Sequence, residues 1–320
     1  MNLRLSVSAA TRLRRFDLAI VALAFLLLAA ALSPQRVTDF AIFCIFVLSY
    51  DLLYGHMGRL SFGHMLYLGV GAYAAALSAG PSGGNPLLAL LAAAAAGALA
   101  GLLLGPIAIR AAGASFALIN LAFNQIGHFA ALIGLAPWTG GEDGLSVAFR
   151  PVGPLDLGNK RLLFGFTLAT LLASLWFMRR LTGSPFGILL RSIKQNETRA
   201  RFLGYDLSLA KLGAFVISST LAAFAGGLAI VNYTYVTPSF IDPSRNVEVV
   251  FAALIGGAGS VYGAVCGGVA YMLISNFLPN HIQRWEMFLG IALLLLVFRF
   301  RSGIWGFLLQ RLAPSRAEGA

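Results

Sequence analysis

Charged residues are scarce in this chain, and acidic residues are the scarcest. Asp, Glu, Lys and Arg together make up 11% of the 320 residues, and only 12 residues are Asp or Glu. Hydrophobic residues make up 58%, and the mean hydropathy is +0.82. A soluble domain has no core large enough to bury so much apolar surface. The composition therefore excludes a soluble globular protein and predicts an all-α polytopic membrane protein, with a single transmembrane domain over residues 1–320.

The sequence also lacks the motifs that carry enzymatic chemistry. No lysine follows a glycine, so the chain has no GxxxxGK[ST] phosphate-binding loop and is not expected to bind ATP itself. It has no HExxH motif and its four histidines are scattered, so no metal site is expected. Ser61 and Ser260 lack the base that a nucleophile needs. We expect no catalytic residue and no cofactor, with an intramembrane enzyme as an alternative class.

Basic residues outnumber acidic ones by 23 to 12, which gives a formal net charge of +11. They cluster at the ends of hydrophobic runs, where Lys and Arg set the topology of a membrane protein and contact anionic lipid. This placement excludes a nucleic-acid-binding role. Four arginines precede the first apolar run, residues 18–32. We interpret this run as an uncleaved first helix with a cytoplasmic N-terminus, and a cleaved signal peptide is the alternative.

Apolar runs predict about ten membrane-spanning helices. Spans after the first are expected at about residues 40–54, from residue 61, and at 87–109, 115–135, 162–178 and 212–231. The stretch 247–278 is too long for one helix and contains the sequence GGAGS at 256–260, so we predict a short inbound helix, a glycine turn and an outbound helix. With a last span at 287–298, this arrangement places the C-terminal arginines in the cytoplasm.

One polar, basic stretch interrupts the hydrophobic sequence at residues 184–204, SPFGILLRSIKQNETRARFLG. The loop around it, residues 179–211, carries seven basic and two acidic residues, so the positive-inside rule predicts a cytoplasmic loop. Ser-Pro at the start and Gly204 at the end predict one helix that runs through residues 187–203. Such a helix can transmit force from a soluble partner.

The apolar residues of this predicted helix recur at spacings of three and four. They are Phe186, Leu189, Leu190, Ile193, Ala200 and Leu203. We expect this face to rest on the membrane domain, while Arg191, Lys194 and Arg199 face water.

Two of the predicted spans carry distinctive faces. Gly97 and Gly101, followed four residues later by Gly105, predict a helix-packing face. Asn120 and Asn124, followed four residues later by a histidine, place polar groups on one face of the span at 115–135. Polar groups in a bilayer must be paired or in contact with water. This face either makes hydrogen bonds between helices or lines a translocation pathway for a polar solute.

The two glycine-rich breaks share residues at an offset of 199. Gly58 corresponds to Gly257 and Ser61 to Ser260. Paired interrupted segments in two halves of a transporter indicate a pathway between the halves. Ser61 and Phe62 are therefore a second set of candidate pathway residues, although glycine-rich sequences match one another easily.

The loop at 136–160 is rich in Gly and Pro, and alternation of the spans predicts that it is periplasmic. Its Glu142 and Asp143 either contact a basic binding protein or form a solvated acidic turn.

Several motifs in combination identify a family. GRLSFGHMLYLGVGAY, FALINLAFNQI, TGGEDGL, the basic stretch, GGAGSVYGAVCGG and FRFRSGIWG occur in this order, over about residues 40–306. The chain resembles the branched-chain amino acid permease family of ABC importers. The resemblance implies an ABC importer permease fold in a bacterial inner membrane. It also implies a second homologous permease, two ATP-binding subunits that hold the ATP, and a soluble solute-binding protein.

The resemblance also assigns a role to the basic stretch. In such importers a short helix with a Glu-Ala-Ala and Gly pattern fits a groove on the ATPase subunit. Ala200 lies four residues before Gly204 as this pattern requires, and Glu197 lies one place before the family's Glu. The resemblance thus implies that Arg191, Glu197, Ala200 and Gly204 seat the loop on the ATPase. The alternative for Glu197 is a surface ion pair with Arg201.

Substrate identity is not readable from these residues. Leucine, isoleucine and valine are what the family implies, and urea or short amides are the alternative within it. A self-sufficient carrier or channel is an alternative of another class. Ion-coupled carriers need ionisable groups deep in the bundle, whereas Asp51, Glu248 and Glu286 are predicted near the ends of spans.

Overall fold

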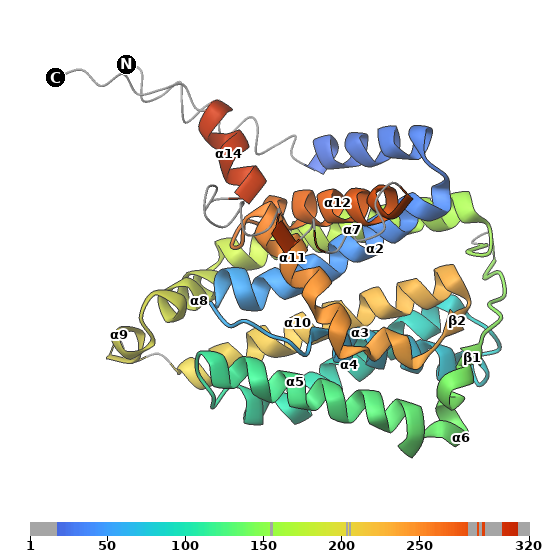
Figure 1. Ribbon diagram of the computed structural model, residues 1–320, viewed down its shortest axis with the longest axis horizontal. Coiled ribbons are helices and arrows are strands. Elements are labelled where there is room, and N and C mark those ends of the chain that lie inside the picture. Colours follow the sequence, from blue (N-terminus) through green and yellow to red (C-terminus); the bar gives the residue numbers. More distant parts are fainter. Residues whose placement is uncertain are drawn as a thin grey trace.

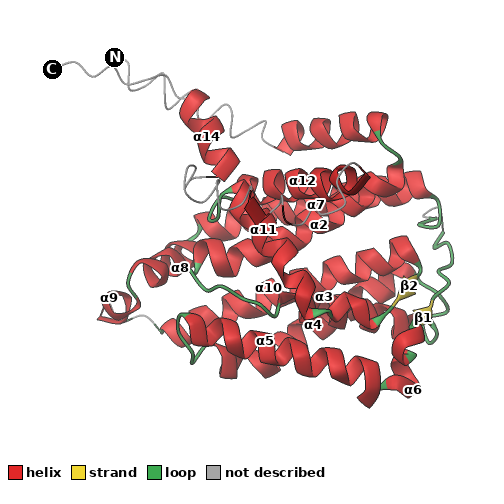
Figure 2. Cartoon of the chain, viewed as in Figure 1, coloured by secondary structure: helices red, strands yellow, loops and turns green. Residues whose placement is uncertain are grey.

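The computed structural model describes residues 18–153, 156–202, 204, 206–280, 287, 290–291 and 303–312. These residues form a helical bundle with one short antiparallel strand pair, β1 (Leu145–Ser146) and β2 (Tyr235–Val236) (Figures 1 and 2). Within the described part of the chain, five helical segments are long and apolar enough to cross a membrane: Pro34–His56, Pro86–Ala108, Ala114–Gly134, Lys160–Gly183 and Leu207–Tyr233. The prediction of an all-α polytopic membrane protein is confirmed. The predicted count of ten also needs the span 287–298, most of which lies outside the described residues.

The remaining elements are shorter or continue these five segments. The first apolar helix is Leu18–Ala31. In chain order the others are α2 (Pro34–Asp51) with the π-helical turn η1 (Leu52–His56), α3 (His64–Ala79), α4 (Pro86–Ala108), α5 (Ala114–Phe129) with the π-helical turn η2 (Ala130–Gly134), α6 (Ala136–Thr139), η3 (Gly141–Asp143), α7 (Lys160–Gly183), α8 (Pro185–Gln195), α9 (Glu197–Phe202), α10 (Leu207–Tyr233), η4 (Pro238–Ile241), η5 (Pro243–Arg245), α11 (Asn246–Gly256), α12 (Val261–Phe277), η6 (Leu278–Asn280) and α14 (Gly303–Leu312).

Helix α10 lies at the centre of the bundle and packs against α2, α3 and α4. Small residues make these contacts close. Gly97, Gly101 and Gly105 of α4 all face α10, so the packing face predicted from their spacing is confirmed. Gly71 of α3 and Gly226 of α10 bring these two helices into backbone contact, because a Cβ atom at either position would overlap a carbonyl group of the other helix. The packing of α10 against α3 and α4 is therefore built on close backbone approach.

The chain is broken at both predicted glycine-rich positions. One break separates η1 from α3, and the other separates α11 from α12. Gly58 in the first break has φ +76° and Gly257 in the second has φ +101°, a region that residues with a Cβ atom rarely adopt. The predicted short helix, glycine turn and second helix near the C-terminus are present as α11, residues 257–260 and α12.

The two ends of the bundle differ in what they carry (Figure 1). Helices α8 and α9 lie at one end, which we call the basic end. The opposite end, which we call the loop end, carries α6, the β1–β2 pair, and the turns η4 and η5. Helices α2 and α7 run from the loop end to the basic end, and α10 runs back.

The basic stretch forms two helices, so the prediction of one continuous helix over 187–203 is wrong. Helix α8 ends at Gln195, and Asn196 is extended, with φ −164° and ψ 101°. The Asn196 side chain accepts a hydrogen bond from the Arg199 backbone N–H at 2.9 Å, and so caps the start of α9. An asparagine side chain that competes for backbone N–H groups thus divides the segment.

Helix α10 begins five residues earlier than the predicted span at 212–231. The Asp206 side chain accepts hydrogen bonds from the backbone N–H groups of Ser208 and Leu209, which fixes the helix start at Leu207. Lys211, counted as a loop residue in the sequence, is consequently part of the helix and faces the interior.

Candidate functional site

Glu197, the first residue of α9, connects three parts of the chain. Its Oε1 atom accepts a hydrogen bond from Lys211 Nζ of α10 at 2.6 Å. Its Oε2 atom accepts one from Arg59 Nη2, in the break before α3, at 2.5 Å. Arg201 Nη2, one turn further along α9, lies 3.8 Å from Oε1. We call Glu197, Arg59 and Lys211 the Glu197 network.

Burial makes this network important for stability. The side chains of Arg59 and Lys211 are only 9% and 8% exposed, whereas that of Arg201 is 74% exposed. A buried cation is costly unless it is paired, so Arg59 and Lys211 depend on the carboxylate. The alternative interpretation of Glu197 as a surface ion pair with Arg201 is therefore incomplete, because its shorter contacts are to the two buried cations.

The same contacts set the ionisation of Glu197. Partial burial raises the pKa of its carboxyl group, but the hydrogen bond and charge of Lys211, with the charges of Arg59 and Arg201, lower it further, and the net pKa lies below its usual range. Glu197 is therefore ionised at neutral pH and holds both buried cations.

Lys194 of α8 makes a second contact with the bundle. Its Nζ atom donates a hydrogen bond to the Gly55 carbonyl oxygen in η1 at 2.7 Å. Lys194 is exposed as predicted, but its long side chain also reaches from this exposed position to the backbone of η1. The basic end thus contacts η1 through Lys194 and the following break through Glu197.

The two glycine breaks meet at the basic end. A Cβ atom at Gly55 would overlap both Asp51 and the Gly259 backbone nitrogen. The Asp51 Oδ1 atom accepts a hydrogen bond from the Gly259 N–H at 2.8 Å, and Oδ2 lies 3.3 Å from His56 Nδ1. We call this contact of Gly55, Asp51 and Gly259 the glycine junction. It brings together the two breaks that share residues at the offset of 199.

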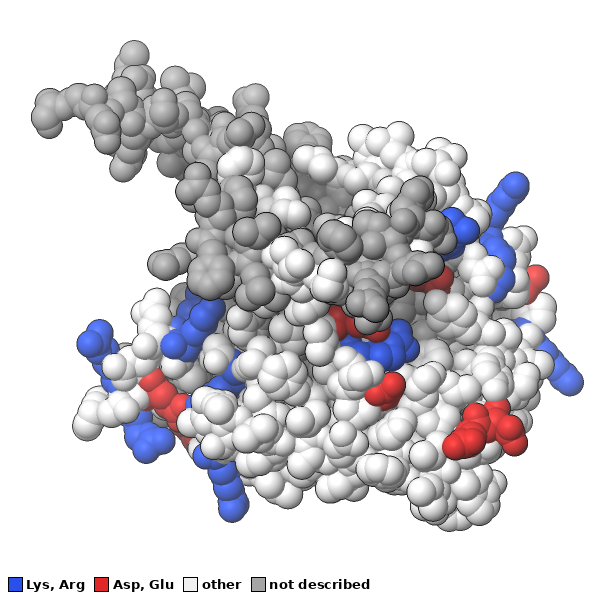
Figure 3. Space-filling view, viewed as in Figure 1, with Lys and Arg blue, Asp and Glu red and all other residues white. Residues whose placement is uncertain are grey.

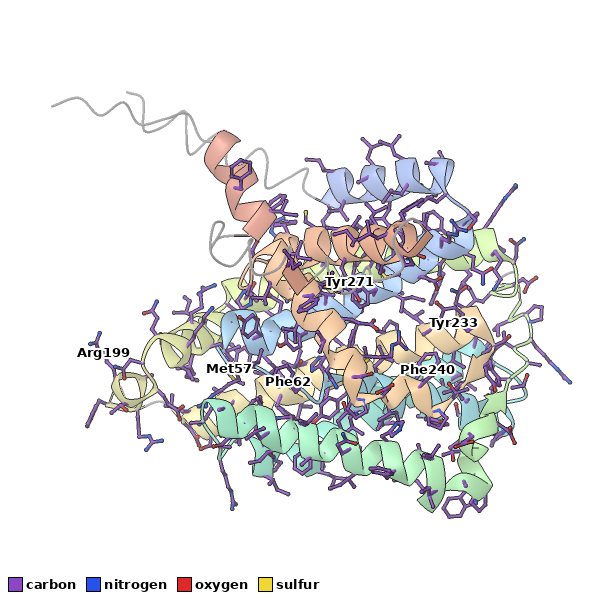
Figure 4. The ribbon with its side chains drawn as sticks, in the orientation of Figure 1. Met57, Phe62, Arg199, Tyr233, Phe240 and Tyr271 are labelled. Carbon is purple, nitrogen blue, oxygen red and sulfur yellow. The ribbon has the colours of Figure 1, made fainter. Side chains whose placement is uncertain are left out.

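The other residues predicted to seat the loop lie around the Glu197 network. Arg191 is exposed on α8. Gly204 is exposed with φ +80°, so the predicted glycine turn is present. Ala200 is buried and packs within this chain, on the side of α9 that faces the bundle. Arg199 points away from the bundle (Figure 4). The contacts of these residues with an ATPase stay a prediction.

Phe202 is a feature that the sequence reasoning missed. It ends α9 and is 86% exposed. A large apolar side chain among exposed arginines, on a segment expected to face water, is a candidate anchor for a partner protein. Its position opposite to Ala200, on the face of the predicted helix that also carries Arg191 and Thr198, could have indicated this role.

The polar face of α5 binds the turn between α10 and α11. Asn124 is fully buried, donates a hydrogen bond to the Ile241 carbonyl oxygen at 2.5 Å, and accepts one from Asn246 Nδ2 at 2.6 Å. His128 Nδ1 lies 3.3 Å from the Pro238 carbonyl oxygen. The predicted hydrogen bonds from this face of α5 to other segments are therefore present. A role of this face in a translocation pathway stays a prediction.

The structure brings Asn120 and the first break together. A Cβ atom at Gly63 would overlap the Asn120 carbonyl group, so the two backbones are in contact. Ser61 is buried and its Oγ accepts a hydrogen bond from the Gly63 N–H at 3.3 Å. Phe62 is half-buried between the basic end and α5 (Figure 4). The structure thus places the Asn120 backbone against the break that carries Ser61 and Phe62, the other candidate pathway residues.

The loop end contains a cavity of about 460 Å³ between α2, α3, α10, α11 and α12. Tyr233, Phe240 and Arg245 line it together with residues from the helices. Figure 4 shows Tyr233 and Phe240 near each other at this end of the bundle. The predicted outer loop closes over the same end, where the Tyr235 hydroxyl donates a hydrogen bond to the Asp143 carbonyl oxygen.

Comparisons with known proteins agree with this architecture. The family model described as branched-chain amino acid transport system / permease component matches residues 35–298. The permease protein LivM of a high-affinity branched-chain amino acid transport system from Salmonella typhimurium is 27% identical over 308 residues, covering 88% of this chain and 72% of LivM. LivM of Escherichia coli is 27% identical over 289 residues, covering 81% and 66%.

A more distant relative is the probable LivM of Methanocaldococcus jannaschii, 26% identical over 116 residues, or 36% of this chain and 34% of that protein. No solved structure matches. Because the family model covers well over half of the chain, the chain belongs to the family of branched-chain amino acid transport system permease components.

Proposed function

We propose that this chain is a membrane permease subunit of an ABC importer that moves leucine, isoleucine or valine across the bacterial inner membrane, driven by ATP hydrolysis on a separate subunit. Membership of the permease family supports this proposal. The observation that carries the mechanism is the Glu197 network, which connects the basic α8–α9 segment directly to the helices of the bundle.

The partners are a second homologous permease, two ATP-binding subunits and a soluble solute-binding protein. The ATPase docks on the exposed side of α8 and α9, where Arg191, Arg199 and Phe202 are available and Gly204 permits the turn that follows. Phe202 enters an apolar groove, and the arginines contact acidic groups around it. The basic charge of this end favours a cytoplasmic position, with both chain termini on the same side.

The coupling mechanism is alternating access. ATP closes the ATPase dimer and moves α8 and α9 with it. Glu197 transmits this displacement to Arg59 in the first break and to Lys211 of α10, and Lys194 transmits it to Gly55.

The displacement then reaches the pathway. The glycine junction extends it from the first break to the second, since Asp51 holds the Gly259 backbone. Ser61, Phe62, Asn120 and Asn124 are the residues proposed to line the pathway beside the first break, and they would change exposure as it moves.

Co-purification from membranes in mild detergent tests the proposal, with each retained partner identified by mass. The native chain is expected to retain a P-loop ATPase and a second permease. Arg199→Glu combined with Phe202→Ala is expected to lose the ATPase and retain the permease. Arg161→Glu, an exposed arginine at the loop end, is the matched control and is expected to retain both. A native chain that purifies alone, yet moves leucine when reconstituted alone, would show that it is a self-sufficient carrier.

A further inference from the structure

The cavity at the loop end combines an apolar floor with a charged rim. Its apolar lining, which we call the floor, includes Phe43, Met65 and Met272 from α2, α3 and α12. Its charged lining, which we call the rim, consists of Asp39 of α2, Arg245 of η5 and Glu248 of α11. Figure 3 shows acidic and basic side chains next to each other in the middle of this face of the molecule. The cavity volume of about 460 Å³ lies within the range of ligand sites, about 300–1,000 Å³.

The charged groups of the rim retain the capacity to bind a ligand. Arg245 donates from Nε to Glu248 at 3.0 Å and from Nη1 to the Ser239 carbonyl oxygen at 3.5 Å. A guanidinium group has five N–H donors, so these two bonds leave others that can point to a carboxylate. The Arg245 side chain is 43% exposed, which keeps it accessible from the cavity mouth.

The acidic side of the rim is held in place by the bundle. Asp39 accepts hydrogen bonds from Asn232 Nδ2 at 2.6 Å and from the Tyr233 hydroxyl. The rings of Tyr233 and Phe240 lie 6.4 Å apart in an edge-to-face arrangement beside it. A carboxylate next to aromatic faces is a favourable place for an alkylammonium group.

We propose that this cavity is a solute site for a zwitterionic amino acid with a branched aliphatic side chain, with Arg245 binding the carboxylate, Asp39 the ammonium group, and Phe43 and Met272 the side chain. The inference rests on the proposed function and names the site where the solute enters the permease. It also separates the substrates within the family, because urea and short amides carry neither charge and gain little from an apolar floor.

Two hydrogen bonds join the lining of the cavity to the candidate pathway residues. The Met65 backbone N–H in its floor donates to Asn246 Oδ1 at 3.0 Å, and Asn246 Nδ2 donates to Asn124 Oδ1. Met65 is the second residue of α3, directly after the break that contains Ser61. Hydrogen bonds thus link the cavity lining to Asn124 and, through the start of α3, to the break that contains Ser61.

Direct binding to the purified importer complex in nanodiscs, without the solute-binding protein, tests this site. Radiolabelled L-leucine is the probe. The competitors are unlabelled leucine, 3-methylbutylamine, which lacks the carboxylate, and 4-methylpentanoate, which lacks the ammonium group. Arg245→Gln is expected to weaken the binding of leucine and of 4-methylpentanoate at least tenfold and to leave the binding of 3-methylbutylamine unchanged. Asp39→Asn is expected to weaken the binding of leucine and of 3-methylbutylamine and to leave the binding of 4-methylpentanoate unchanged.

Arg161→Gln, which removes an exposed arginine outside the cavity, is the matched control and is expected to leave all three ligands unchanged. Equal loss of all three ligands in the Arg245 and Asp39 variants would mean a structural role and would overturn the site. No leucine binding to a wild-type complex that still transports leucine with ATP and binding protein would overturn it too. A wild-type complex that transports no leucine under those conditions refutes the proposed function instead.

Discussion

The two ends of this bundle use the same charged residue types in opposite ways. At the basic end, Arg59 and Lys211 are buried, and both form ion pairs with the carboxylate of Glu197. At the loop end, Arg245 and Asp39 lie at the rim of a cavity, and Arg245 is nearly half exposed. Buried ion pairs can transmit a displacement because neither partner can move alone. Charged groups that line a cavity remain available to a solute. On our proposals, the first arrangement couples the permease to its ATPase and the second recognises the solute.

Removing the carboxylate at the basic end should have the largest effect. Glu197→Ala leaves two buried cations without their partner, and we expect it to destabilise the protein by about 3 kcal/mol, at the low end for breaking a buried pair because Glu197 is partly exposed. Thermal unfolding of the complex in detergent measures this. Arg201→Ala, the exposed neighbour, is the control and should cost less than about 0.5 kcal/mol. Equal effects of the two substitutions would contradict the distinction between buried and exposed partners.

A methyl group at the glycine junction should have the next largest effect. Gly55→Ala places a Cβ atom against Asp51 and the Gly259 backbone, so we expect a loss of about 2 kcal/mol from overpacking, and reduced transport. Gly165→Ala in α7 is the matched control, since nothing lies within 4 Å of its added Cβ. Helix propensity predicts a gain of up to about 1 kcal/mol there. Tolerance of Gly55→Ala in both assays would show that the two breaks do not need to touch.

The Lys194 contact should matter less for stability than for coupling. Lys194→Met removes the hydrogen bond to Gly55 but keeps a side chain that can pack against Gly58, so we expect a cost of only about 1 kcal/mol. Transport per ATP hydrolysed should fall more than the stability does. Lys194→Arg can still donate and should restore most of the transport. A Met variant with wild-type transport would remove Lys194 from the mechanism.

The pH dependence of the Glu197 network is the smallest expected effect. The lowered pKa of Glu197 means that its stabilisation is present above the pKa of an unfolded Glu, about 4.3, and is lost as the pH falls through the lower folded value. The difference in unfolding temperature between wild type and Glu197→Gln should thus be constant from about pH 6 to 8 and shrink below about pH 4. A difference that grows on acidification would have the wrong sign for an ionised Glu197.

Local patterns predicted much of this fold. The apolar runs predicted the long membrane-spanning helices, and the glycine run at 256–260 predicted the break between α11 and α12. The excess of basic residues identified the α8–α9 segment. These features depend on neighbouring residues. The helix break at Asn196 was missed because a capping side chain competes with an otherwise good helical pattern.

The contacts that define the two ends could not be read in the same way. Arg59 and Glu197 are 138 positions apart, so only the tertiary fold brings the break before α3 next to α9. Asp39 and Arg245 belong to different halves of the chain and meet only at the cavity. The sequence did contain a general signal. A single charged residue within an apolar segment, such as Arg59, must pair with another group, but the sequence does not identify that group.

A double-mutant cycle on Glu197 and Arg59 tests the central claim most directly. Leucine moved per ATP hydrolysed would be measured in the reconstituted importer for wild type, Glu197→Gln, Arg59→Gln and the double variant. We expect each single variant to retain ATP hydrolysis while transport falls at least tenfold, and the double variant to be no worse than either single one, because all three lose the same connection. Losses that multiply in the double variant, or single variants that transport normally, would show that the Glu197 network does not couple α9 to the bundle.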